Sequence, residues 1–149
     1  MRTTEAIRSI LRKKGGQLYW LEPEATVYDA IALMSAKSAG ALLVMKDGRL
    51  LGIISERDYA RKVVLEGRSS RETRVEQIMT SPVKVVGPEE TVDECMKKMT
   101  AARIRHLPVV EGERVVGIVS IGDLVKWTVT KQEETIEQLS SYIAGGYPG

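Results

Sequence analysis

Histidine and cysteine are nearly absent from this chain of 149 residues, which has one of each, His106 and Cys95. A single cysteine excludes an internal disulfide, and no residues around it have the spacing of metal ligands. One histidine and one cysteine also leave little from which to assemble a Ser-His-Asp or Cys-His centre. We therefore expect a protein without catalytic residues and without a required metal, in a reducing, cytoplasmic setting.

The sequence also lacks long apolar runs and an excess of charge of one sign. No segment approaches the roughly 18 apolar residues that span a bilayer, and the N-terminus has no signal-peptide core. The 22 basic and 20 acidic residues give a net charge of +2, which is too balanced to imply nucleic acid by bulk electrostatics. We expect neither a membrane nor a nucleic acid as a partner.

Two basic segments leave alternatives open. Residues 1–14 have the pattern of a short surface helix with Ile7, Ile10 and Leu11 inward, and the same pattern resembles an organelle presequence. Residues 61–74 read as a solvated linker because acidic residues interrupt their charges, with nucleic-acid binding as the other interpretation. Their basic side chains are Arg61, Lys62, Arg68, Arg71 and Arg74.

What the chain does contain is an internal repeat at an offset of 65 residues. Positions 22–64 align with positions 87–129 without a gap, and 14 of the 43 pairs are identical. Only two copies are present, which indicates a tandem duplication rather than a solenoid. Hydrophobic residues make up 43% of the sequence, which predicts a packed globular protein, either one compact domain or two small halves that share a core.

Each copy predicts strand, helix, strand, strand, helix, an α/β (α+β) unit of β-α-β-β-α order. In the second copy we expect strands at 82–86, 106–110 and 115–120, a helix from the capping box Thr91–Glu94 to about Ala102, and another helix from Ser120. The predicted organisation is an N-terminal helix (1–16), repeat one (17–67), a linker (68–74), repeat two (75–130), and a tail helix ending in GGYPG (131–149). The tail carries Ile136, Leu139 and Ile143 at helical spacing, a stripe that needs a partner surface.

The sequences GIISERD (52–58) and GIVSIGD (117–123) place the same strand-to-helix junction in both copies. A serine cap leaves free N–H groups and the positive end of the helix dipole at the strand end, which favours an anion. An aspartate one turn later can accept two hydrogen bonds from a vicinal diol. S-x-x-D is also close to a capping box, so a purely structural role stays open.

These junctions, each preceded by a hairpin and by P-E-x-T-V, resemble the signature of tandem cystathionine-β-synthase (CBS) domains over residues 17–130. The resemblance implies two repeats related by a pseudo-twofold axis, with two clefts for adenine nucleotides: AMP, ADP, ATP, NAD(H) or S-adenosylmethionine. It implies phosphate or ribose contacts by Ser55 and Ser120, and ribose diol contacts by Asp58 and Asp123. It also implies a homodimer built through helices.

Other candidate site residues follow from the same alignment. The resemblance implies that the starts of the first strands frame the adenine. These starts contain Gln17 and Tyr19 in copy one, and Val83 and Lys84 in copy two. Arg103, Arg105 and His106 lie at a helix-to-strand junction, where guanidinium groups suit phosphate and a solvated helix end is the alternative. Arg57 aligns with Gly122, so the clefts should differ in charge.

Five side chains also have structural interpretations. We expect Cys95 to be buried, with redox sensing as the alternative, and His106 to serve as a hydrogen-bonding group rather than a base. One of Tyr19 and Trp20 should face the core, and Trp127 should pack against the tail helix.

Two function hypotheses follow. The first is a non-catalytic regulatory sensor that binds an adenine nucleotide and signals through dimer packing or an unidentified regulated protein. The second is an interaction scaffold with vestigial clefts.

Overall fold

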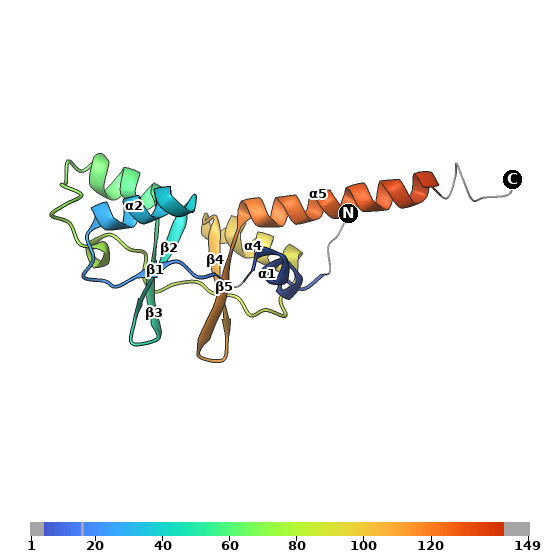
Figure 1. Cartoon of the computed structure of the whole chain (residues 1–149), viewed down its shortest axis with the longest axis horizontal. Coiled ribbons are helices and arrows are strands. Elements are labelled where there is room, and N and C mark those ends of the chain that lie inside the picture. Colours follow the sequence, from blue (N-terminus) through green and yellow to red (C-terminus); the bar gives the residue numbers. More distant parts are fainter. Residues whose placement is uncertain (1–4, 16, 142–149) are drawn as a thin grey trace, which may run out of the picture.

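The computed structural model describes residues 5–15 and 17–141, and Figure 1 shows two halves of like architecture. The first half contains β1 (Trp20–Leu21), α2 (Val27–Lys37), β2 (Ala41–Lys46), β3 (Arg49–Ser55), α3 (Glu56–Tyr59) and the π-helical turn η1 (Ala60–Val64). The second half contains α4 (Val92–Ala102), β4 (His106–Glu111), β5 (Arg114–Ser120) and α5 (Ile121–Ser141). α1 (Arg8–Lys14) precedes both halves, and the 3-10 turn η2 (Val75–Gln77) lies between them. The predicted α/β repeat is confirmed.

The two hairpins have the same register. β2 pairs antiparallel with β3, beginning with Ala41 opposite Ser55, and the pairing shifts after Val44. Adding 65 to each number gives the pairing of β4 with β5, from His106 opposite Ser120, including the shift after Val109. The two S-x-x-D junctions therefore start α3 and α5 from equivalent positions.

The first helix of each half is capped at both ends. The Thr26 side chain accepts the N–H of Asp29 at the start of α2, and Thr91 forms a full capping box with Glu94 at the start of α4. Ser38 and Arg103 end these helices in the left-handed region, with φ of 51° and 56°. The capping box predicted for α4 is confirmed, and Arg103 is fixed at the turn into β4.

The strand predicted at 82–86 is wrong, because only Val86 forms a β-bridge, with Val109. In the first half, Leu43 donates its N–H to Tyr19 O at 3.2 Å, which ties β1 to β2. The residue equivalent to Leu43 is Pro108, which has no N–H to donate. The second parallel pairing is therefore reduced to one bridge, and β1 itself has only two residues.

The segment predicted as a linker packs against the first half. Val27 and Tyr28, in the first turn of α2, donate their N–H groups to Thr73 O at 2.8 Å and to Ser70 O at 2.9 Å. The guanidinium of Arg71 stacks 3.9 Å from the ring centroid of Tyr28. These bonds satisfy helix-terminal donors, so the backbone of residues 70–73 caps the start of α2.

Each half has its own core, and each core is completed by the segment that precedes the other half. Ile7 and Ile10 of the N-terminal segment are buried in the second core, with Leu11 packed against it. Val75 and Ile78, in and after η2, are buried in the first core. The sequence predicts correctly that Ile7, Ile10 and Leu11 face inward. It does not show which half these residues cover.

The covering segments are themselves a repeat, IRSIL at 7–11 and VEQIM at 75–79, with an offset of 68. They lie over the two signature glycines. A Cβ added at Gly52 would meet Met79 Sδ at 2.5 Å, and one added at Gly117 would meet Leu11 Cδ2 at 2.5 Å. Glycine has no Cβ, so it leaves room for these contacts without a shift of the covering side chains.

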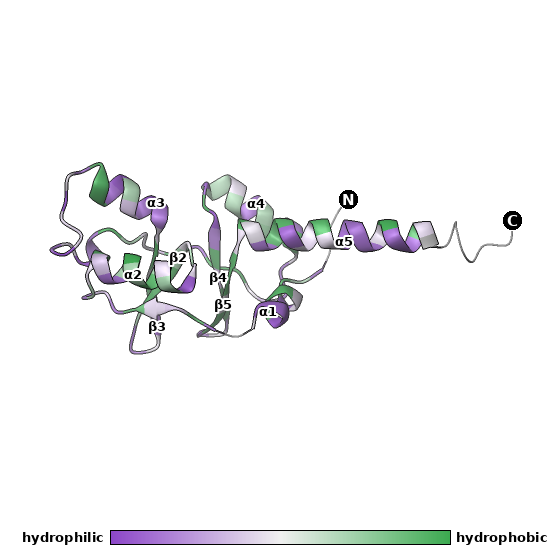
Figure 2. Cartoon of the chain, turned by 45° about the horizontal axis from the view of Figure 1, so that its top comes forward, coloured by the Kyte–Doolittle hydropathy of each residue, from purple (hydrophilic) through white to green (hydrophobic). Residues whose placement is uncertain are grey.

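α5 is one continuous helix of 21 residues, so the expected boundary at 130/131 falls within it. The prediction that Trp127 packs against a separate tail helix is therefore wrong. Trp127 packs against the second core, which contains Ile7 and Ile10. The amines of Lys13 and Lys131 lie 5.2 Å and 4.8 Å from the centroid of its ring. The far part of α5 projects from the body (Figures 1 and 2). Ile143 and the GGYPG end lie outside the described residues.

Candidate functional site

Ser55 and Ser120 are the N-caps that the sequence predicts. The Ser55 hydroxyl accepts the N–H of Asp58 at 3.2 Å, and the Ser55 N–H donates to Asp58 Oδ2 at 3.0 Å. In the second half, the Asp123 N–H donates to Ser120 Oγ at 3.1 Å, and the Ser120 N–H donates to Asp123 Oδ2 at 2.8 Å. Both junctions are therefore capping boxes, which is the structural role left open above.

Asp58 has further partners besides its cap. Its Oδ1 lies 3.0 Å from Lys62 Nζ and accepts a hydrogen bond from the Thr80 hydroxyl at 3.3 Å. Its side chain is only 12% exposed. A ligand that uses this carboxylate must therefore replace the lysine or the threonine.

Asp123 has a different cation. Lys14, at the end of α1, donates to Asp123 Oδ2 at 2.7 Å and to Ile118 O at 2.9 Å. Burial by itself would raise the pKa of Asp123, but the hydrogen bonds from Lys14 and Ser120 outweigh it and hold the pKa below its ordinary value. Asp123 is thus an anion at neutral pH, and its side chain is 23% exposed.

The predicted arginine and histidine residues lie where the halves meet. Arg57, in the first turn of α3, donates to Arg103 O at 3.2 Å. A Cβ added at Gly40 would lie 3.3 Å from both His106 Nε2 and Glu56 Oε1, so these two side chains converge on the glycine from opposite halves. The Arg105 carbonyl accepts the N–H of Ile121 at 2.8 Å. Arg57, Arg103 and Arg105 are exposed residues.

His106 is held neutral by its surroundings. Burial is the largest cause of its lowered pKa, and the nearby Lys14 adds to it, while Asp123 and Glu56 oppose the shift. These causes place His106 among charged groups from α1, α3 and α5. A neutral imidazole at neutral pH suits the predicted hydrogen-bonding role.

The candidates for the adenine position are spread over both halves. The Tyr19 hydroxyl donates to Gln17 Oε1 at 2.6 Å, and the Lys37 amine lies 5.5 Å from the Tyr19 ring centroid. Tyr19 packs against the first core and Trp20 is 48% exposed, so the expected alternation is confirmed with Tyr19 inward. Val83 is partly buried on the irregular segment before Val86.

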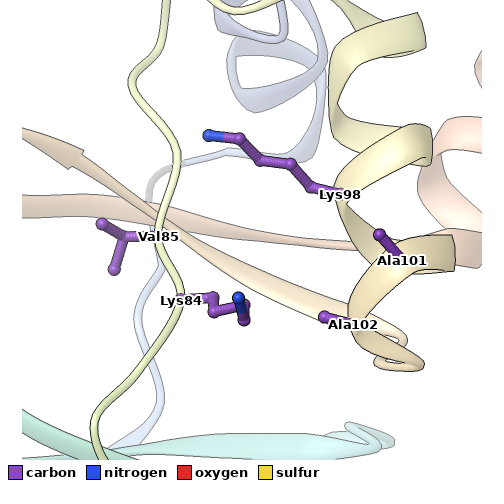
Figure 3. A pocket seen from close by; sticks show the side chains of 5 residues that line it. All are labelled: Lys84, Val85, Lys98, Ala101 and Ala102. Carbon is purple, nitrogen blue, oxygen red and sulfur yellow. The ribbon is translucent and has the colours of Figure 1, made fainter.

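Lys84 lines a hollow of about 300 Å³ (Figure 3). Its other lining residues are Val85, on the same segment, and Lys98, Ala101 and Ala102 on α4. Lys84 gives the hollow a cation and the small alanines give it an apolar wall, whereas the Lys98 amine is paired with Glu90 at 2.7 Å. This lining is compatible with a flat apolar ring carrying an anionic group. Lys84 is the one predicted site residue among those five.

Sequence reasoning missed three groups that engage the signature carboxylates: Lys14, Lys62 and Thr80. Lys62 stands four residues after Asp58, a spacing at which helical side chains meet, so it was detectable. Lys14 and Thr80 follow the covering segments 7–11 and 75–79, and each contacts the aspartate of the half that its segment covers. Their roles therefore depend on which half each segment covers, and the sequence does not show this.

The alternative chemistries have no geometric basis in the described residues. Cys95 is fully buried, and burial raises the pKa of its thiol to about 11, which removes thiolate reactivity. Within residues 5–15 and 17–141, no three His, Cys, Asp or Glu side chains could hold a metal ion together. No described helix is long and apolar enough to cross a membrane.

The CBS domain model matches residues 7–65 and 75–129, which together take in both halves. The chain belongs to the CBS-domain family. The matched CBS units begin at Ile7 and Val75, the first residues of the two covering segments, so the first match includes α1. Pairs of CBS domains are regulatory modules.

Among CBS-domain relatives, "CBS domain-containing protein CBSX3, mitochondrial" from Arabidopsis thaliana is 43% identical, over 95% of this chain and 73% of its own. A solved CBS-domain structure from Burkholderia ambifaria has a TM-score of 0.82 and 49% identity, covering 85% of this chain and 96% of that one. The CBS pair of protein MJ0100, solved with 5′-methylthioadenosine and S-adenosyl-L-methionine, has a TM-score of 0.77 and 26% identity, covering 86% and 98%.

Proposed function

We propose that this CBS pair is a non-catalytic regulatory sensor of an adenosine ligand, held at the S-x-x-D junctions and between the halves. The observation that carries the proposal is the paired arrangement of Asp58 and Asp123, each a partly buried carboxylate beside a lysine. The methylthioadenosine and S-adenosylmethionine complex of the MJ0100 pair supports an adenosyl group as the common element.

The lysines favour a ligand that carries phosphate. A ribose diol donates two hydrogen bonds and can replace Lys62 and Thr80 on Asp58. The displaced ammonium then needs an anion, which a phosphate supplies with one or two negative charges, whereas S-adenosylmethionine offers a single carboxylate in a molecule of net positive charge. AMP, ADP, ATP and NAD(H) therefore precede S-adenosylmethionine as candidates, with no metal required.

Self-association and an unidentified regulated protein complete the proposal. A ligand that binds one arrangement of the halves better than another transmits a signal with a coupling of about 1–3 kcal/mol. We infer a homodimer as the signalling unit. The proposed location is cytoplasmic, with the mitochondrion of the CBSX3 relative as the alternative that a fluorescent fusion distinguishes.

Isothermal titration calorimetry tests the choice of ligand. AMP, ADP, ATP, NAD, NADH and S-adenosylmethionine are each titrated into the chain at two salt concentrations. We expect binding of at least one phosphate-bearing ligand, weakened by salt. A lack of heat for all six, with the protein folded, would reject the sensor.

A scaffold with vestigial clefts is the second candidate function. It is favoured by the capping boxes and lysine pairs, which satisfy both carboxylates without any ligand. Under this alternative, the same titrations give no heat while the chain still self-associates.

A further inference from the structure

α5 has an exposed apolar stripe that the nucleotide site does not use. Val125, Val129, Ile136 and Leu139 are 46%, 45%, 62% and 57% exposed. With Gln132 between them, they follow each other at alternating intervals of four and three residues. This is the heptad spacing of a seam between two packed helices, in which one polar residue sets the register.

The stripe faces away from the chain to which it belongs. Leu124 and Trp127 lie on the opposite side of α5 and are buried in the second core. The part of α5 that carries Ile136 and Leu139 projects from the body (Figures 1 and 2). A partner helix can therefore lie along the stripe without displacing the core.

The flanking charges select the partner and its direction. Lys126 and Glu133 occupy equivalent positions of consecutive heptads on one flank, and the other flank has Thr128 and Thr135. In an antiparallel pair each flank faces the same flank of the partner. In a parallel pair each flank faces the other, and both charges would face threonines.

We propose that α5 pairs antiparallel with α5 of a second copy, about an axis between Thr130 and Lys131. Val125 then packs on Ile136 of the partner subunit, and Val129 lies beside Gln132 of the partner subunit. Lys126 faces Glu133 of the partner subunit, and the twofold axis repeats this ion pair. If the two helices were shifted by one heptad, like charges would face each other. The two ion pairs therefore also fix the register of the helix pair.

This inference rests on the self-association proposed above. Four apolar side chains a side are few beside the 20–30 residues of a standard interface. We therefore expect a reversible dimer that dissociates in the micromolar range.

Sedimentation equilibrium of the full chain tests the pairing. Lys126→Glu and Glu133→Lys, made singly, each turn two attractions into two repulsions and should raise the dissociation constant at least fivefold. The double variant restores the opposite charges and should return it to within twofold of wild type. Glu137→Lys, the same charge change off the stripe, is the matched control, and circular dichroism checks the fold of each variant.

Three results would overturn the pairing. A wild-type chain that is monomeric at several hundred micromolar rejects both the self-association and the α5 seam. A wild-type dimer that ignores the charge reversals, or that the double variant fails to restore, rejects the antiparallel seam alone. A dimer weakened by Leu65→Ser, after η1, but not by Ile136→Ser with Leu139→Ser, places the contact elsewhere. Nucleotide titrations are read separately, so failure of the sensor and failure of the seam are distinguishable.

Discussion

Replacing the signature glycines by alanine should affect the two halves unequally. A Cβ at Gly52 meets Met79 Sδ at 2.5 Å and Thr80 O at 3.1 Å, whereas one at Gly117 meets only Leu11 atoms. Ordinary contacts begin at 3.4 Å. Thr80 is fixed to Ile53 by backbone hydrogen bonds of 3.1 Å and 2.8 Å, so its carbonyl cannot move as freely as the tip of Leu11.

The magnitudes follow from overpacking, which typically costs about 1–3 kcal/mol. For Gly52→Ala we expect a loss of about 2 kcal/mol, because both a side chain and bonded backbone must shift. Gly117→Ala should lose about 1 kcal/mol or less, because the leucine tip can rotate and the lower entropy of the unfolded chain offsets part of the strain. At roughly 2–4 °C per kcal/mol for a chain of this size, the Tm values should differ by several degrees.

Urea unfolding followed by circular dichroism measures both variants. Leu11→Ala combined with Gly117→Ala should cost no more than Leu11→Ala alone, because the truncated side chain leaves room for the new methyl. Met79→Ala should rescue Gly52→Ala only in part, since Thr80 O remains. Equal costs for the two glycine variants, or full rescue by Met79→Ala, would refute this packing argument.

Three further predictions concern titratable groups. With its pKa raised to about 11, Cys95 should react with a thiol reagent at pH 8 only after urea unfolds the chain; rapid reaction of the folded chain would contradict its burial. Because the pKa of His106 is lowered in the folded state, the unfolded chain binds the imidazole proton at a higher pH than the folded chain does. The stability of the fold should therefore decrease as pH drops below about 6.5. His106→Gln should flatten that part of a Tm-against-pH curve. The lowered pKa of Asp123 stabilises the fold above about pH 4, and this stabilisation is lost as pH falls through the folded pKa. Lys14→Met should reduce that loss. A Tm-against-pH curve that Lys14→Met leaves unchanged at acid pH would exclude the Lys14 contact.

The sequence predicted the features that depend on local chemistry. The 65-residue repeat predicted both hairpins, and S-x-x-D and T-x-x-E marked helix starts that carry the expected caps. These predictions hold because capping and strand alternation act over a few residues.

What the sequence did not predict depends on contacts between distant segments. The missing strand at 82–86 follows from Pro108, whose absent N–H matters only once its partner segment is known. Asp123 is paired with Lys14 because α1 covers the second half. The covering segments repeat at an offset of 68 residues, which differs from the 65-residue offset of the two halves. The boundary expected at 130/131 falls within α5, which runs without interruption from Ile121 to Ser141.

The role of the repeated aspartates is tested most directly by ligand-induced shifts in Tm for Asp58→Ala and Asp123→Ala. Both variants also lose a capping box, so Glu94→Ala, which breaks the equivalent Thr91 box of α4, is the control. At about 100 times its dissociation constant, a ligand should stabilise the wild type by roughly 2.7 kcal/mol, a shift of several degrees. If the signature aspartates hold the ligand, at least one aspartate variant loses this shift while Glu94→Ala keeps it. If all three variants keep the wild-type shift, or no adenosine ligand produces one, the aspartates are helix caps alone.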